Sequence, residues 1–267
     1  MKKLTMLGTG SAMVTKCYNT CFTLSNDDEH FLVDTGGGNT ILTNLEKTGI
    51  PINRIHSVFI SHEHNDHLSG IIWIIRAVAT EISKENYTGD LHIYCHKNIE
   101  DITRKICALI LQTRFTKFID NRIFFREIED NQTVNILGCD TTFFNIQSKE
   151  VIQFGFRTTL SNGKILTFLG DEAYRDAIFN YANEADYLLH EAFCLYSQKD
   201  IFHPYEKHHV TVKEACENAE KLNIKNLLLF HTIDHDISNR KKLFIQEGNE
   251  YFNGTIFVPD DLDVIEL

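Results

Sequence analysis

The heptapeptide SHEHNDH at residues 61–67 places three histidines and one aspartate within six positions. It follows the apolar run 55–60, which has the composition of a buried β-strand. Imidazole nitrogen and carboxylate oxygen are the donors that zinc accepts, and a loop can fold neighbouring donors around one or two ions. A polar surface loop rarely concentrates three histidines. The stretch therefore predicts a divalent metal site built on His62, His64, Asp66 and His67.

Other apolar runs along the chain also end at polar residues. These runs precede Gly8-Thr9-Gly10-Ser11, Asp34, Gly170-Asp171, His190-Glu191 and His231. Binding sites in α/β folds gather at the carboxyl ends of strands. Taken alone, Asp171 is a turn residue and His231 a core histidine, but a metal loop needs distant partners. We therefore expect both as further ligands.

Helical and turn signals lie between these strands. Residues 68–82 carry a wide apolar face, and residues 99–115 place Ile99, Ile102, Ile106, Leu109 and Ile110 at helical spacing. Thr211 and Glu214 form a capping-box pattern, and Asn162-Gly163 predicts a hairpin between strands 154–159 and 164–169. The order of strands and helices in the later half roughly repeats that of the first half, and no linker separates the two halves. We expect one domain over residues 1–267, made of two fused halves that join near residue 140.

Composition excludes several functional classes. A net charge of −11 disfavours a broad nucleic-acid-binding surface, since polyanion binding needs clustered Lys and Arg. No signal peptide or 18-residue apolar run is present, so we expect a cytoplasmic protein without a membrane segment. We expect its seven cysteines to be reduced and to be small buried residues. Residues 8–10 and 36–38 match neither the dinucleotide fingerprint nor the Walker loop, so no nucleotide cofactor is expected.

The order of these motifs resembles the metallo-β-lactamase superfamily, and more narrowly its ribonuclease Z-like branch. The resemblance rests on His-x-His-x-Asp-His and on later matches at residues 7–12 (LGTGSA), 169–171 (LGD), 189–192 (LHEA), 209–211 (HVT) and 229–231 (LFH). It implies an α/β fold, a four-layer αβ/βα sandwich with two mixed β-sheets. It also implies two divalent metal ions. Zinc is the expected metal, and manganese or magnesium is an alternative.

The resemblance implies a ligand set for each ion. His62, His64, a third histidine and Asp171 would hold one ion. Asp66, His67, the shared Asp171 and His231 would hold the other. This sequence departs from the pattern because Gln147 stands where the third histidine is expected. An amide oxygen is a weaker, neutral ligand, so we expect one ion to bind less tightly.

The resemblance also implies a metal-dependent hydrolase that uses a metal-bound hydroxide. Asp66 would orient the nucleophile, His209 would give a proton to the leaving oxygen, and Glu191 would orient His209. Asp34 either supports the metal loop by hydrogen bonding or simply forms a turn.

Three substrate classes remain open from the sequence. The first is a phosphodiester, and a small or cyclic one is favoured over transfer RNA. Processing enzymes of that branch carry a long arm, whereas Gln147 and Asp171 are only 24 positions apart. The second class is a thioester, a lactone or another carboxyl ester. The third is a metal-binding or sensor protein with weak turnover. A homodimer is also left open.

Overall fold

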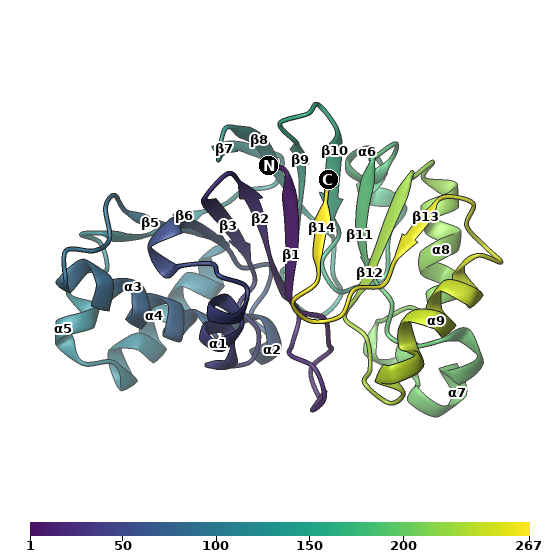
Figure 1. The fold of residues 1–267 in the computed structure, drawn as a ribbon, viewed down its shortest axis with the longest axis horizontal. Helices are drawn as coiled ribbons and strands as arrows, with labels where there is room; N and C mark the ends of the chain where they lie inside the picture. Colours follow the sequence, from purple (N-terminus) through teal and green to yellow (C-terminus); the bar gives the residue numbers. More distant parts are fainter. The chain divides into compact units, whose positions relative to one another are not determined.

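The computed structural model describes residues 1–267, which form two compact units. Unit one comprises Met1–Gly8, Thr20–Glu129 and Leu262–Leu267, and unit two comprises Thr9–Asn19 and Asp130–Asp261. Each unit contains one seven-stranded sheet with its own helices (Figure 1). The expected single domain with a joint near residue 140 stays a prediction.

The sheet of unit one is mixed. Its strand order is β14-β1-β2-β3-β4-β5-β6. The first four strands pair antiparallel, and β3 to β6 run parallel. Lys3 pairs with Glu266, so the N and C labels lie near each other in Figure 1. The strands are β1 (Lys3–Gly8), β2 (Cys21–Asn26), β3 (Glu29–Val33), β4 (Ile55–Phe59), β5 (Leu91–Cys95), β6 (Ile123–Glu127) and β14 (Val264–Glu266).

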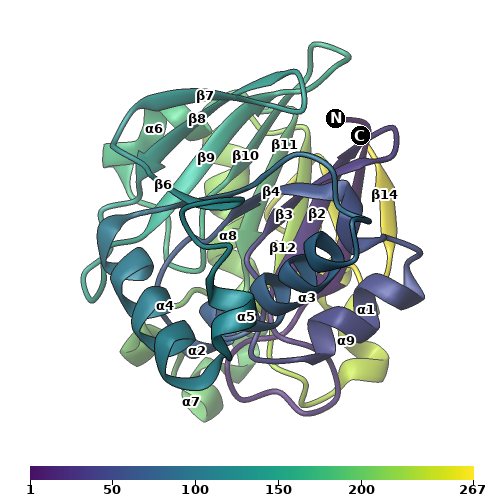
Figure 2. The ribbon, with the colours of Figure 1, turned by 90° about the vertical axis from the view of Figure 1, so that its left-hand side faces the viewer.

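The helices of unit one pack beside one another, and Figure 2 shows α1 next to α3 and α5 between α3 and α4. The expected helix over 68–82 corresponds to α2 and α3, which are separated at Ser69 and Gly70. The helices are α1 (Thr40–Lys47), η1 (Ile52–Arg54), α2 (Asn65–Leu68), α3 (Ile71–Ser83), α4 (Lys97–Ile110) and α5 (Thr113–Thr116).

The expected helix over 99–115 requires a correction. The backbone is extended at Leu111 and Gln112, so the segment forms two helices, α4 and α5. The buried side of α4 carries Ile99, Thr103 and Cys107. Leu109 and Ile110 are exposed, because the helix turns them away from the face that packs on the sheet.

The sheet of unit two is also mixed, in the order β13-β12-β11-β10-β9-β8-β7. Strands β7 to β10 pair antiparallel, and β10 to β13 run parallel. The hairpin predicted from Asn162-Gly163 is confirmed between β9 and β10. The strands are β7 (Gln132–Ile136), β8 (Cys139–Asn145), β9 (Phe154–Thr159), β10 (Ile165–Phe168), β11 (Tyr187–Glu191), β12 (Asn226–Phe230) and β13 (Thr255–Phe257).

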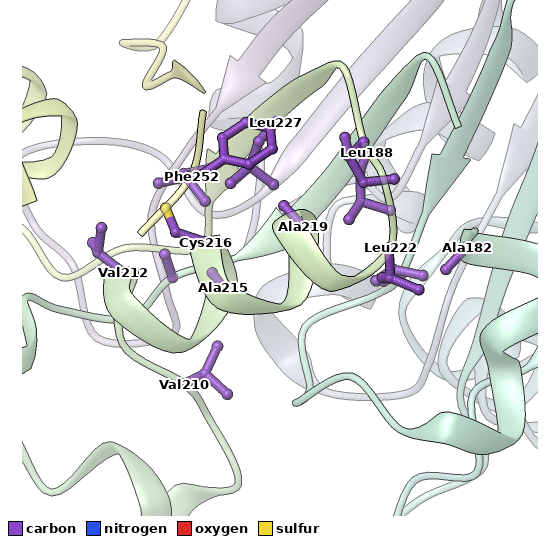
Figure 3. Close-up of a cluster of buried hydrophobic side chains, with 14 of the residues drawn as sticks. Ala182, Leu188, Val210, Val212, Ala215, Cys216, Ala219, Leu222, Leu227 and Phe252 are labelled. Carbon is purple, nitrogen blue, oxygen red and sulfur yellow. The ribbon is translucent and has the colours of Figure 1, made fainter. Parts of the chain in front are cut away.

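Helix α8 (Val212–Lys221) packs on β11 and β12 through small residues, including Ala215, Cys216 and Ala219 (Figure 3). The predicted capping box at its start is confirmed, because Thr211 N donates to Glu214 Oε2 at 2.9 Å. The other helices of unit two are η2 (Asp176–Ile178), α6 (Phe179–Ala182), η3 (Tyr196–Gln198), α7 (Lys199–Phe202), η4 (Pro204–Lys207) and α9 (Ile237–Gly248).

All seven cysteines are free, and six of them are buried, as expected for small apolar side chains. None of the helices has the length and apolar character needed to cross a bilayer.

Candidate metal centre

The loop of unit one that carries SHEHNDH begins directly after β4, and its Asp66 and His67 lie on the short helix α2. His62, Asp66 and His67 are buried, whereas His64 is exposed. His62 Nε2 lies 3.0 Å from His64 Nδ1, and His62 Nδ1 lies 3.0 Å from Ser61 Oγ. The His62 and His67 rings are 4.2 Å apart between centroids. The predicted cluster of imidazoles therefore forms.

Asp34 holds this loop in place. It follows β3, which runs parallel to β4, so the two strand ends meet at one edge of the sheet. The Asp34 carboxylate accepts hydrogen bonds from Ser61 N at 2.8 Å and Ser61 Oγ at 2.8 Å, and it contacts His67 Nδ1 at 2.9 Å. The expectation that Asp34 supports the metal loop is confirmed. Because Nδ1 of His67 is bound to Asp34, Nε2 is the ring nitrogen available for a metal.

Unit two contributes a second set of donors at the ends of three neighbouring parallel strands. Asp171 follows β10, Glu191 ends β11 and His231 follows β12. His231 Nε2 lies 3.5 Å from Asp171 Oδ2. His231 adopts φ of 56°, a left-handed conformation that is costly for a non-glycine residue and is concentrated at functional sites.

The amide that contacts Asp171 is that of Gln153, and the expectation placed on Gln147 stays a prediction. Gln147 is exposed, and its backbone N–H binds Asn145 Oδ1 at 2.8 Å. Gln153 is buried, and its Nε2 donates to Asp171 Oδ1. Gly170 permits this approach: its φ is 74°, and a Cβ there would lie 3.1 Å from Gln153 Cδ.

His209, whose side chain is 15% exposed, pairs with the buried Glu191 beside Asp171. His209 Nδ1 lies 3.5 Å from Glu191 Oε2 and 2.9 Å from the backbone oxygen of Asp171. Glu191 Oε1 accepts a hydrogen bond from Val210 N at 2.7 Å, so Glu191 fixes the segment that carries His209. The contact expected between these two residues is present.

Electrostatics favour the charged form of the His209 ring. Burial opposes that charge, but Glu191 and Asp171 together outweigh burial and raise the pKa of His209 to about 9. Burial raises the pKa of Glu191 to about 7, although His209 counteracts it. At neutral pH, His209 is therefore able to give up a proton.

Phe193 and Gln153 did not emerge from sequence reasoning. The Phe193 ring stacks on His209 with centroids 4.9 Å apart and an interplanar angle of 7°. Gln153 directly precedes the expected strand 154–159, and this position was the only sequence signal for it. Nothing in the sequence distinguished Phe193 from an ordinary core residue.

The donor set fits a divalent cation. His62, Asp66, His67, Asp171 and His231 each have 5% or less of their surface exposed. Each unit thus contributes buried imidazole and carboxylate donors, which are the kinds of ligand that a divalent cation accepts. Burying carboxylates is costly unless a cation or a set of hydrogen bonds compensates, and a bound metal would do so.

Three comparisons place the chain among known proteins. Ribonuclease Z of Lactobacillus helveticus is 25% identical over 99% of this chain and 97% of its own length. The metallo-β-lactamase fold protein YhfI from Bacillus subtilis superposes with a TM-score of 0.79 at 19% identity, covering 100% of this chain and 99% of that protein. The short form of human tRNase Z gives a TM-score of 0.74 at 22% identity, covering 98% of each chain.

These matches confirm two expectations. The chain is a ribonuclease Z-like protein of the metallo-β-lactamase superfamily, and its fold class is the expected α/β type with two mixed sheets flanked by helices. A family model described as anti-Pycsar protein Apyc1 matches residues 2–222. Because that model spans well over half of the sequence, the protein belongs to the anti-Pycsar Apyc1 family.

Proposed function

We propose that this protein hydrolyses a small phosphodiester, with cyclic nucleotides as the substrate class. The coarser expectation, a metal-dependent hydrolase of phosphodiester bonds, is borne out by the ribonuclease Z relatives and the metallo-β-lactamase fold neighbours. The observation that carries the proposal is the pair of the half-buried His209 and the buried Glu191 beside Asp171 and His231. This pair places a proton donor next to candidate metal ligands.

The proposed ligands are the six residues expected from the sequence, His62, His64, Asp66, His67, Asp171 and His231. These residues would hold two divalent ions, with zinc as the expected metal. When bound, such ions lower the pKa of a coordinated water and polarise the phosphoryl oxygen. Gln153 replaces Gln147 as the candidate amide at the site, since it contacts Asp171.

The chain's own residues perform the remaining tasks. Asp66 orients the attacking water, while Asp34 holds His67 in one tautomer. His209 holds a proton on its ring and delivers it to the oxygen that leaves. Glu191 positions His209 and favours its charged form.

The short segment between Gln147 and Asp171 supports a small substrate. Between Gln147 and Asp171 lie only a short connection, β9, a turn and β10, which leave no room for an RNA-gripping arm. The alignment with Lactobacillus helveticus ribonuclease Z runs over 314 positions, so that relative carries segments absent from this 267-residue chain. The net charge of −11 also disfavours a long polyanion.

A hydrolysis panel tests the proposal. Metal-loaded protein is assayed on cyclic nucleotides, bis(p-nitrophenyl) phosphate, a transfer RNA precursor and a thioester, with and without chelator. We expect chelator-sensitive turnover of the cyclic nucleotides. Turnover only of the RNA, or only of the thioester, contradicts the proposal. No turnover of any substrate indicates a binding or sensor protein.

His209→Gln tests the proton donor. We expect kcat to fall roughly 100-fold or more, since general acid catalysis contributes about 10²–10⁴-fold. His203→Gln is the matched control, because His203 is an exposed histidine of the same unit. Equal kcat in both variants would rule out the assigned role of His209.

A further inference from the structure

Arg240 of α9 is a buried cation of unit two, with only 3% of its surface exposed. We propose that Arg240 is a positioning residue that holds the backbone at His231 and the start of the loop 9–19 in the geometry that metal binding requires. The inference rests on the proposed function for the assignment of His231 as a metal ligand. It goes beyond that function because Arg240 lies outside the proposed ligand set.

The guanidinium group of Arg240 joins three segments that are far apart in sequence. Its Nη1 donates to Thr232 Oγ1 at 2.8 Å and to Thr9 Oγ1 at 3.1 Å. Its Nη2 donates to the backbone oxygen of Pro259 at 2.7 Å and to Asp260 Oδ1 at 2.8 Å. A buried charge is costly unless hydrogen bonds and an opposite charge compensate it, and both are present here. Arg240 therefore fixes the positions of these three segments relative to one another.

Thr232 connects Arg240 to a proposed metal ligand, because it directly follows His231. The φ of 56° at His231 is costly for a residue with a side chain, and such a conformation persists only where surrounding contacts determine it. Thr232 supplies contacts of this kind, since its N donates to Thr9 O at 3.1 Å and its O accepts from Ser11 N at 3.0 Å. The hydrogen bond from Arg240 holds the side chain of the same residue.

Thr9 extends the effect of Arg240 to the loop 9–19. The Thr9 hydroxyl accepts a hydrogen bond from Arg240 and donates one to Asp261 Oδ1 at 2.8 Å. Asp261 also accepts from Thr9 N at 3.0 Å and from Tyr18 N at 2.5 Å, which joins the two ends of the loop. Removing the guanidinium would therefore loosen the start of the loop together with the backbone beside His231.

A second anchor holds the middle of the loop 9–19 independently of Arg240. The carboxylate of Asp234 accepts hydrogen bonds from Thr15 N at 2.6 Å and from Lys16 N at 2.7 Å. The loop thus keeps part of its fixation when the guanidinium is removed. For this reason we expect a conservative Arg240 variant to fold.

Arginine is better suited to this position than lysine. The planar guanidinium presents several donors in a fixed fork, whereas the lysine ammonium is a compact point charge. Arg240→Lys keeps the charge but cannot reproduce all the hydrogen bonds to Thr232, Thr9 and Pro259 at once. An arginine that only stabilised the fold would lose stability on this change without altering the metal site.

A competition titration with a chromophoric chelator measures the zinc affinity of Arg240→Lys and of the unaltered protein. We expect the affinity to fall at least about tenfold, because residues that orient a ligand contribute on this scale. The visible absorption of the cobalt-loaded protein is the second readout, since it reports ligand geometry, and Arg240→Lys should shift it. Arg157→Lys is the matched control and should change neither readout. Arg157 is a half-buried arginine of β9 that donates to Tyr181 O at 2.6 Å.

Thr232→Val tests the route by which Arg240 acts. Valine has nearly the same shape as threonine and removes only the hydroxyl that Arg240 binds. This variant should also lower the zinc affinity. Combined with Arg240→Lys, it should add less than its separate effect, because the two residues act through one hydrogen bond.

An unchanged zinc affinity and cobalt spectrum in folded Arg240→Lys overturn the inference. So does a fully additive loss in the double variant, or an equal loss in Arg157→Lys. If Arg240→Lys does not fold, Thr232→Val decides, and an unchanged affinity there also overturns the inference. If the hydrolysis panel fails while Arg240→Lys weakens zinc binding, the proposed function falls and the positioning role stands. If cyclic nucleotides are hydrolysed and all variants bind zinc equally, only the positioning role falls.

Discussion

His67 Nδ1 lies 2.9 Å from Asp34 Oδ2, and both side chains are fully buried. His67 Nε2 in turn lies 3.4 Å from Asp66 Oδ2. The Asp34 contact fixes the orientation of the ring and makes Nε2 more basic as a ligand. Asp34, which is not among the proposed ligands, thus orients the ring of one proposed ligand.

Asp34→Asn should lower zinc affinity about 10–100-fold, the usual effect of losing such a supporting carboxylate. A competition titration with a chromophoric chelator measures it. Asp27→Asn is the control, because Asp27 is exposed but has nearly the same φ, 54° against 53° for Asp34. Equal zinc affinities in the two variants would remove Asp34 from the metal centre.

The amount of metal retained after dialysis distinguishes the roles of Gln147 and Gln153. Gln153→Ala should lower the amount of metal retained after dialysis, because Gln153 binds the proposed ligand Asp171. Gln147→Ala should leave it unchanged, since Gln147 is exposed. Elemental analysis of both dialysed variants gives the answer, and the reverse order would restore the assignment of Gln147.

Acidification should destabilise the fold through His190. Burial lowers the pKa of His190 to about 4, so the folded ring stays neutral while the unfolded ring binds a proton below its ordinary value of 6.5. The contribution of the neutral His190 ring to the free energy of unfolding is therefore fully present above pH 6.5, and it is lost as the pH drops towards 4. The loss amounts to at most about 3 kcal/mol.

His190→Gln should flatten that loss, because the glutamine amide does not titrate. Its amide can also replace the ring contacts with the Glu191 carbonyl at 2.8 Å and Asn218 Nδ2 at 3.4 Å. Urea midpoints at pH 7 and pH 5, measured with chelator present, make the comparison. An equal drop in both proteins would assign the effect to other groups.

Glu214→Ala should destabilise unit two by about 1 kcal/mol, since it removes the partner of Thr211 at the start of α8. Tyr205 also loses its 2.6 Å hydrogen bond to Glu214. Glu217→Ala, a replacement further along the same helix, should have a smaller effect. Thermal unfolding of the two variants provides the measurement.

Local patterns in the sequence predicted most of the framework. Apolar runs identified the strands that precede Asp34, His62, Asp171, Glu191 and His231, because a strand and the polar residue after it are adjacent in sequence. The capping box at Thr211 and the hairpin at Asn162-Gly163 were visible for the same reason.

Features that depend on irregular or distant segments were not predictable. Residues 146–153 follow no repeating pattern, so the sequence could not show that Gln153, and not Gln147, faces Asp171. Apolar spacing in α4 suggested a longer helix, because exposed Leu109 and Ile110 read like core residues. The stacking of Phe193 on His209 joins residues whose sequence types alone indicate no contact.

The anchoring of the loop 9–19 has a consequence for folding. Its partners Asp234 and Asp261 lie 219 and 252 positions away from Thr15 and Thr9, respectively. During synthesis this loop leaves the ribosome early but cannot take its final position until nearly all of unit two has followed. Contacts of such long range form late and slowly. A partly synthesised chain would therefore contain several finished strands while loop 9–19 still lacked its anchors at Asp234 and Asp261.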